Sequence, residues 1–257
     1  MMERYERNLY YVTAQEQEAL KRTKIFLGGA GIGSYIAEAI LRVGIENITI
    51  ADGDKVELSN LNRQNYTSKD IGHYKAEVLS RRLLDINPNA NIKYHTEYIN
   101  KENVHDMVQG ADLAINALDY QTDIPFVFDS VCKEKGIPVL HPYNLGWAAM
   151  VIVVSPESDG FIPQDNIDCN HFEIKVVEKA ITAVRPYENT DWLEKVLKNY
   201  KQSGMRNSPP QLVTGCQLAA ALSTALIFKL ITGKPIKTYP HFYFHSLITP
   251  DFSDYTL

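Results

Sequence analysis

The chain has 257 residues, of which 45% are hydrophobic and 22% are charged. These proportions are ordinary for soluble globular proteins and indicate neither a disordered nor a membrane class. Because the formal net charge is −5, the chain is a poor general binder of polyanions, and nucleic acid is not expected as its main partner.

The N-terminal residues and the cysteines indicate a cytoplasmic protein. MMERYERNLYY has no apolar core followed by a small-residue cleavage site, so no signal peptide is predicted. Cys132, Cys169 and Cys216 are odd in number and form no CxxC pair. A disulfide framework and a four-cysteine zinc site are therefore not expected.

The first half of the chain alternates predicted strands with predicted helices. It begins with a helical lead-in over residues 1–22, in which Thr13 and Glu16 have the spacing of a capping box. Strands are then expected over residues 24–29, 47–52, 91–99, 111–118 and 137–143, and helices over 34–44, 73–88, 103–110 and 124–136. This alternation predicts a parallel sheet that is covered on both faces.

Beyond Asn144 the alternation ends. The pattern there predicts a strand at 148–156, helices at 172–184 and 190–201, a long apolar helix at 212–231 and a closing strand at 241–248. The apolar stretch is long enough to span a membrane, but its polar residues favour a buried or subunit-interface helix, and no membrane contact is expected.

The whole chain is thus predicted to be one α/β domain with a Rossmann-like doubly wound sheet. The sheet is parallel in its N-terminal half and has a mixed or antiparallel C-terminal extension. The expected segments are the lead-in (1–22), a nucleotide-binding core (23–155), a variable substrate segment (156–210), and an interface helix with a closing strand (211–257).

A glycine turn follows the first predicted strand. Glycines at 28, 29, 31 and 33 permit a tight turn, and the next helix directs its free N–H groups and its positive dipole end toward a ligand. Asp52 ends the second strand, where an acid accepts hydrogen bonds from ribose hydroxyls. The turn and the acid together predict a nucleotide site without specifying the nucleotide.

A charged segment after the second strand favours phosphate chemistry. A dehydrogenase has no reason to place such residues beside its ribose acid. Arg63 can bind phosphate oxygens through paired N–H donors, and Lys75, at the start of a helix, supplies a point charge. Asn60 offers an amide to phosphate or to a metal-bound water.

This segment, DxDxVExSNLxRQ followed by IGxxKA, resembles the signature of the ThiF/MoeB/HesA family, bacterial relatives of ubiquitin-activating enzymes. The residues Arg4-Tyr5-Glu6-Arg7 are similar to the family's RYxRQ. Asp119 falls where the family ends its fourth strand with a metal-binding aspartate. The resemblance spans residues 3–155 and resumes at 211–235.

The resemblance implies an adenylyltransferase that activates the C-terminal carboxylate of a small ubiquitin-like sulfur carrier or of a peptide. Asp119 would hold Mg²⁺, and Arg7 would reach into the partner's site of a homodimer; both residues, with Arg63 and Lys75, would serve catalysis. The ATP-binding residues implied are Gly28, Gly31, Gly33, Asp52, Asp54, Asn60, Arg63, Gln64 and Lys75.

The sequence also departs from the family. The two CxxC pairs that hold zinc in many members are missing, so zinc is not expected. Tyr120 and Asp123 stand where members carry Asn and Arg after the metal aspartate, which puts the usual way of holding an acceptor peptide in question. Cys169 lies near the place of a catalytic cysteine, although the acidic residues Asp168 and Glu173 near it in the sequence disfavour a reactive thiolate.

Simpler interpretations stay open for these residues and for the function. Arg7 could be a solvated charge, and Asp119 could cap the helix near Asp123. The alternative functions are a tRNA-modifying cyclic dehydratase of the same superfamily, a catalytically silent heterodimer partner and, more distantly, a nicotinamide dehydrogenase.

Overall fold

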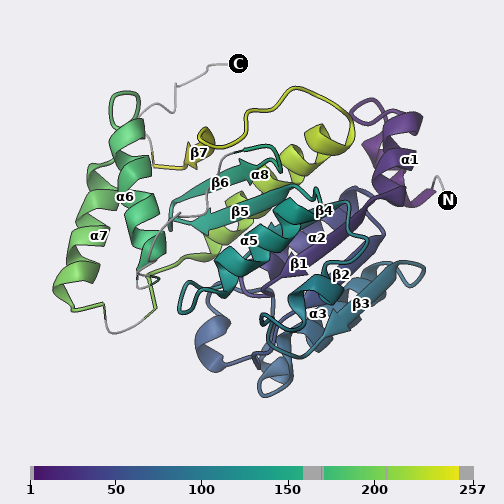
Figure 1. The fold of residues 1–257 in the computed structure, drawn as a ribbon, viewed down its shortest axis with the longest axis horizontal. Helices are drawn as coiled ribbons and strands as arrows, with labels where there is room; N and C mark the ends of the chain where they lie inside the picture. Colours follow the sequence, from purple (N-terminus) through teal and green to yellow (C-terminus); the bar gives the residue numbers. More distant parts are fainter. Residues whose placement is uncertain (1–2, 159–168, 170, 206–207, 249–257) are drawn as a thin grey trace.

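A single sheet with helices on both faces forms the centre of the computed structural model, which describes residues 3–158, 169, 171–205 and 208–248 (Figure 1). Within these residues the strand order is β3-β2-β1-β4-β5-β6-β7. The strands are β1 (Lys24–Gly28), β2 (Asn47–Ala51), β3 (Asn91–His95), β4 (Leu113–Asn116), β5 (Val139–Asn144), β6 (Ala148–Val154) and β7 (Phe242–Ser246).

Strand direction divides the sheet into two parts. Strands β1 to β5 pair in parallel, whereas β6 is antiparallel to β5 and β7 is antiparallel to β6. This confirms the predicted fold class, including its antiparallel C-terminal extension.

The helices are α1 (Ala14–Arg22), α2 (Gly33–Val43), α3 (Lys75–Ile86), α4 (Val104–Met107), α5 (Ile124–Glu134), α6 (Phe172–Val184), α7 (Asp191–Gln202) and α8 (Val213–Ile231). Short 3-10 turns lie at η1 (Glu3–Asn8), η2 (Leu58–Asn60) and η3 (Ser68–Asp70). Helices α1, α2, α3 and α8 share one apolar core, while α4 and α5 cover a second and α6 and α7 a third.

The alternation of side chains along each strand assigns these cores to opposite faces of the sheet. In β1, Ile25 and Leu27 belong to the core under α2, whereas Phe26 belongs to the core under α5. In β6, Val151 faces the first core and Met150 the core under α6 and α7. Strands that are buried on both faces explain why their sequences are continuous apolar runs.

Helix α8 is, by length and composition, apolar enough to cross a membrane. In the structure it packs against α2, β5 and β6, and Ala220, Leu226 and Ile227 join the core there. One side of the helix is therefore buried against the sheet and α2, and its role at a subunit interface stays a prediction.

The predicted order of elements is confirmed, and the differences lie at their ends. The lead-in consists of η1 and then α1, which starts at the predicted capping box of Thr13 and Glu16. The strand predicted over 91–99 ends at His95, because its partner β2 ends at Ala51, the residue paired with His95. Part of the variable substrate segment expected over 156–210 lies outside the described residues.

The connections change direction between β1 and β4. From β1 the chain moves outward to β2 and β3, and it then returns to place β4 and β5 on the other side of β1. In doubly wound sheets, ligands bind at the carboxyl ends of the strands beside such a switch point. The glycine turn after β1 and the loop after β4 both lie at this edge.

Candidate active site

The glycine turn brings the ends of β1 and β4 into close contact. Gly29 has a φ of +93°, and a Cβ atom at this position would lie 2.3 Å from Ala117 O. Ala117 N donates to Gly28 O at 2.8 Å. Both the backbone conformation and the lack of space therefore require glycine at 29, and the turn lies directly against the loop that carries Asp119.

Helix α2 opens toward the same edge. Its N-cap residue, Ile32, provides no side-chain hydrogen bond to the free N–H groups. A Cβ at Gly33 would lie 2.9 Å from Leu27 Cδ1, so this glycine lets the helix approach β1 closely. A Cβ at Gly31 would lie 3.2 Å from Gln64 Nε2. The turn thus leaves uncapped N–H groups at the strand edge, an arrangement that suits an anion.

Asp52 links the second strand to the glycine turn. Ala30 N donates to its Oδ2 at 2.6 Å, and Asp54 N donates to its Oδ1 at 2.8 Å. Desolvation raises the pKa of Asp52, while the charge of Lys75 and the two backbone donors act to lower it. The carboxyl group is thus fixed in orientation at the end of β2, where the sequence places a ribose acceptor.

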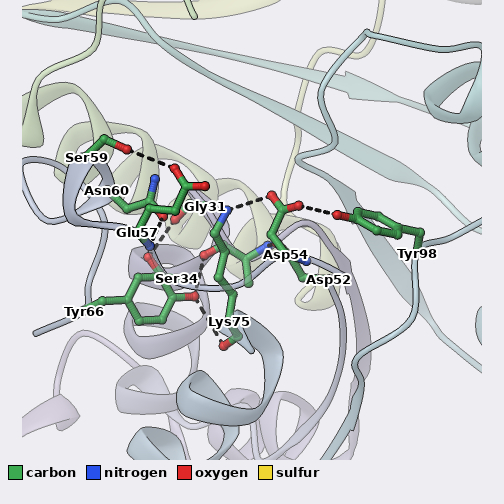
Figure 2. A network of polar contacts seen from close by, with 11 residues as sticks. Gly31, Ser34, Asp52, Asp54, Glu57, Ser59, Asn60, Tyr66, Lys75 and Tyr98 are labelled. Atoms are coloured by element: carbon green, nitrogen blue, oxygen red, sulfur yellow. Dashed lines mark hydrogen bonds and ion pairs between the residues drawn. The ribbon is translucent and has the colours of Figure 1, made fainter. Parts of the chain in front are cut away.

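Lys75 and Asp54 form an ion pair beside Asp52 (Figure 2). Lys75 is the first residue of α3 and is only 7% exposed. Its Nζ lies 2.9 Å from Asp54 Oδ2. Tyr98 OH donates to the other oxygen of Asp54 at 2.8 Å. Desolvation acts to raise the pKa of Asp54, but the hydrogen bonds from Lys75 and Tyr98 lower it more, so the net pKa lies below its ordinary value.

The loop after β2 folds back on the glycine turn. Tyr66 OH donates to Ala30 O at 2.8 Å, and Asn65 N donates to Ser34 Oγ at 3.0 Å. The Ser34 hydroxyl in turn donates to Gly31 O at 2.7 Å (Figure 2). These bonds hold a long polar loop against the start of α2, and they bring its motif residues to the carboxyl edge of the sheet.

Arg63 lies on this loop with its donors engaged. Its Nε donates to Gln211 Oε1 at 2.6 Å, and its guanidinium also donates to Ser59 O and Asn62 Oδ1, each at 2.9 Å. Asn60 is buried, and its Oδ1 accepts from Glu57 N at 2.9 Å. The loop therefore orients the arginine through its own residues and through the segment that precedes α8.

Asp119 follows the end of β4 and is electrostatically coupled to the cationic residues. The residue as a whole is exposed, but protein atoms crowd its carboxyl group, and this desolvation raises its pKa. The charges of Lys75 and Arg63 act to lower that pKa, and the charge of Asp54 acts to raise it. The N-cap of α5 is Asp123, so the interpretation of Asp119 as a helix cap is wrong.

Arg7 lies away from this edge. It is exposed at the end of η1, whose neighbour Tyr5 donates to Glu46 Oε1 at 3.0 Å. Asn8 Nδ2 donates to Val43 O at 3.1 Å. Val43 ends α2 and Glu46 precedes β2, so η1 lies at the amino ends of the strands. The chain's own Arg7 does not reach the residues gathered at the carboxyl edge.

The structure adds two residues that the sequence analysis missed. Tyr98 lies over Gly53, where a Cβ would be 2.6 Å from the Tyr98 ring, and it binds Asp54. Gln211 binds Arg63 from 148 positions further along the chain. The position of Tyr98 at the end of a predicted strand was a usable signal, whereas nothing in the sequence pairs Gln211 with Arg63.

The three cysteines differ in environment. Cys132 and Cys216 are buried, and burial raises the pKa of both thiols, that of Cys216 to about 11. Cys169 is partly exposed. It directly precedes the region of α6, whose residue Glu173 has a pKa raised by desolvation. The catalytic role of Cys169 stays a prediction.

Fold and site together define the class: a Rossmann-like doubly wound protein with cations and a carboxylate at the switch point of its sheet. The chain matches the ThiF family over residues 5–257, and it belongs to that family. This confirms the resemblance that the motifs indicated.

Three known proteins illustrate the relationship. The chain is 32% identical over 189 residues to the sulfur carrier protein ThiS adenylyltransferase of Bacillus subtilis, covering 69% of this chain and 55% of that protein. It is 38% identical over 117 residues to the tRNA threonylcarbamoyladenosine dehydratase of Haemophilus influenzae, covering 44% of each. The structure of Escherichia coli MccB with ATP has a TM-score of 0.70 at 22% identity, covering 95% of this chain and 70% of that one.

These likenesses differ in what they establish. The structural likeness shows the fold, which the MccB structure shares over nearly the whole of this chain. The chain spans about half the length of the two curated relatives. Their names place adenylyltransferases and a tRNA dehydratase among the relatives in sequence.

Proposed function

We propose that this protein uses ATP to adenylate a carboxylate and releases pyrophosphate. The observation that supports this most directly is the gathering of an uncapped helix N-terminus, Arg63, Lys75 and Asp119 at one edge of the sheet. Cations and helix N-termini neutralise phosphate charge, and such chemistry consists mainly of positioning and neutralisation. Membership in a family with adenylyltransferase relatives points the same way.

The glycine turn and Gln64 fit a nucleotide. Gln64 is 8% exposed, and its Oε1 has no hydrogen-bond partner within the described structure. A buried acceptor without a donor is costly, and a nucleotide hydroxyl or amino group would supply that donor. Glycine at 31 leaves space beside the same side chain. Asp52 is the proposed acceptor for the ribose hydroxyls, with Gly28 and Gly33 shaping the turn.

The acidic residues fit Mg²⁺ held mainly by phosphates. No group of three or more His, Cys, Asp or Glu side chains suited to a metal is found among the described residues. Mg²⁺ usually takes one or two carboxylates and completes its shell with phosphate oxygens and water. Asp119 would supply one carboxylate and Asp54 lies close enough to influence it. The ion would neutralise charge on the triphosphate.

In the proposed reaction, a carboxylate oxygen attacks the α-phosphorus of ATP. A new acyl O–P bond forms, the bond between the α-phosphorus and the bridging oxygen breaks, and pyrophosphate leaves with the electron pair. Both reactants are anionic, so the barrier includes their repulsion. Lys75 and Arg63 lower that barrier by neutralising the phosphates, and Asn60 offers an amide donor to a phosphate oxygen.

Exchange of radioactive pyrophosphate into ATP tests the proposal. Exchange should require both the enzyme and a carboxylate substrate, and Asp119→Ala should abolish it without unfolding the protein. A catalytically silent partner subunit would be indifferent to Asp119→Ala. Absence of ATP turnover with every carboxylate offered, combined with binding of NAD(P)H, would favour a dehydrogenase instead.

The proposed carboxylate is the C-terminus of a small ubiquitin-like sulfur carrier or of a peptide. Support comes from the ThiS adenylyltransferase relative. Recovery of a small protein ending in Gly-Gly with the tagged enzyme, followed by carrier-dependent exchange, would identify it. Cys169 is the proposed acceptor should the acyl group pass to a thiol; a hydroxylamine-sensitive adduct that Cys169→Ser abolishes would support that step.

The protein is also proposed to act as a homodimer in the cytoplasm, with Arg7 of one subunit reaching the other subunit's site. The location of Arg7 at the far end of its own sheet is compatible only with a role in trans or with a surface charge. Mixing Arg7→Ala and Asp119→Ala variants distinguishes these. Each mixed dimer has one intact site of two, so a preparation should regain about a quarter of wild-type exchange when the subunits mix at random and about a half when every dimer is mixed. If no exchange is recovered, Arg7 is a surface charge.

A second candidate is dehydration of a tRNA nucleoside, in which the activated carboxylate belongs to the modified base. The 38% identity to the Haemophilus influenzae dehydratase favours it, and the net charge of −5 weighs against it. Titration with tRNA at several salt concentrations tests this candidate: binding that weakens steeply as salt rises reports phosphate contacts, and no binding at low salt excludes the candidate.

A further inference from the structure

A chain of buried polar side chains lies beneath the loop of Asp119. Asn116, Asp129 and His141 are 4%, 3% and 1% exposed. Asn116 Nδ2 donates to Asp129 Oδ1 at 2.8 Å, and His141 Nε2 lies 3.2 Å from Asp129 Oδ2, at an angle less favourable than that of an ideal hydrogen bond. A carboxylate and an imidazole in an apolar interior are costly to bury, so their presence requires an explanation.

Tyr120 extends this chain toward the active-site loop. Its hydroxyl lies 3.4 Å from His141 Nδ1. A neutral imidazole has one donor and one acceptor, and a carboxylate can only accept. The tautomer that suits these neighbours carries the proton on Nε2, on the side of Asp129, and presents Nδ1 as an acceptor to Tyr120.

The arrangement orients side chains. Asn116 donates to one oxygen of Asp129, and the imidazole of His141 lies 3.2 Å from the other, so the carboxylate is held between two interior side chains. The carboxylate itself is buried. The network therefore acts as a fixed anchor.

Asp129 and His141 hold the segment on both sides of Asp119. Asn116 ends β4 just before that segment and binds Asp129 directly. Tyr120 comes immediately after Asp119 and reaches the same carboxylate through His141. The Tyr120 ring is also packed against Phe126, at 5.3 Å between centroids. Asp119 is thus bracketed by two residues that are tied to one buried point.

We propose that Asp129 and His141 are positioning residues that clamp the loop through Asn116 and Tyr120, and so aim the carboxylate of Asp119 toward Lys75 and Arg63. The functional part of this inference rests on the proposed role of Asp119 in ATP chemistry. The clamp itself concerns only how the loop is held, so it can be tested in the protein without a nucleotide.

The variant Tyr120→Phe removes the hydroxyl and keeps the ring. Mg²⁺ should strengthen ATP binding in the wild type, and in this variant we expect that gain in affinity to fall about 10- to 100-fold, as it does when residues that orient a metal ligand are replaced. Calorimetry with and without the ion measures the gain. The same substitution in an Asp119→Asn background should have no further effect, because the group that the clamp positions is already changed.

A merely structural role gives a different result. General loosening of the fold would make the effects of Tyr120→Phe and Asp119→Asn multiply, and that outcome overturns the proposal. His141→Asn is a second variant, which keeps an acceptor for Tyr120 and cuts the link to Asp129; it should behave like Tyr120→Phe. Tyr243→Phe is the matched control, since it deletes a hydroxyl that accepts from Lys237 N at 2.7 Å, away from this network.

Hydrogen exchange separates the clamp from the proposed function. In the protein without nucleotide, Tyr120→Phe should speed amide exchange over residues 117–120 and leave the core strands unchanged. Unaltered exchange in this segment overturns the clamp. A wild-type protein that binds no ATP would defeat the proposed function alone, and the exchange measurement would still decide the clamp.

Discussion

Replacing Lys75 by methionine should impair activity far more than stability. The ammonium lies 2.9 Å from Asp54 Oδ2. At that separation the attraction is about 6 kcal/mol with an effective dielectric constant of 20, and about 1.4 kcal/mol with that of water. The Asp54 side chain is 46% exposed and that of Lys75 is 9% exposed. Screening and the desolvation of the ammonium therefore leave a net contribution of about 1–2 kcal/mol.

The expected thermal effect of Lys75→Met is a decrease in Tm of about 2–8 °C for a chain of this size. The expected effect on pyrophosphate exchange is larger, about 10²- to 10³-fold, which is typical for loss of one group that stabilises charge in a transition state. Thermal unfolding and exchange rates on the same preparation measure both quantities.

Lys234→Met provides the matched control. Lys234 pairs with Glu16 on the surface, where solvent screens the pair, so its loss should change stability little and leave exchange intact. Wild-type exchange in Lys75→Met, or an equal loss in Lys234→Met, would refute the reasoning that the buried ammonium faces the triphosphate.

Three further outcomes are expected. Gly29→Ala should destabilise the fold by about 1–3 kcal/mol more than Gly72→Ala in urea unfolding, because both positions have positive φ but only the first lacks space for a Cβ; equal losses would contradict this. An alkylating reagent at pH 8 should modify Cys169 first, because burial raises the pKa of the other two thiols; simultaneous labelling of all three would contradict it. Burial acts to raise the pKa of Glu38, but the hydrogen bonds from Arg82 and other donors together lower that pKa by more than burial raises it. The folded pKa of Glu38 therefore lies below the unfolded value of about 4.3. Its contribution is therefore present above that value and lost as pH falls through the folded pKa; the stability difference between wild type and Glu38→Gln should shrink from pH 7 to pH 3, and a constant difference would argue against it.

Much of the architecture could be predicted from local patterns. The buried strands are continuous apolar runs, and the helices have apolar residues at helical spacing, so their order and the parallel sheet follow from the sequence. The capping box at Thr13 and the glycine turn at Gly29 are local as well, because their partners lie within a few residues or depend on backbone conformation alone.

The contacts that complete the site could not be predicted in the same way. The pairing of Arg63 with Gln211 joins residues 148 positions apart, and no periodicity relates them. The buried network was signalled only indirectly, by Asn116 and His141 as polar residues within apolar strands. Such residues need partners, but their spacing does not say which residue on α5 supplies the carboxylate.

The hydrogen bonds around Arg63 have a consequence for affinity. A long, flexible side chain normally loses rotamer freedom when it captures an anion, and that loss weakens binding. Here Gln211, Ser59 and Asn62 already hold the guanidinium in one arrangement. The side chain is therefore ordered when the polypeptide folds. An arriving anion has only to replace neutral acceptors around the guanidinium, which bind the cation less tightly than a phosphate would.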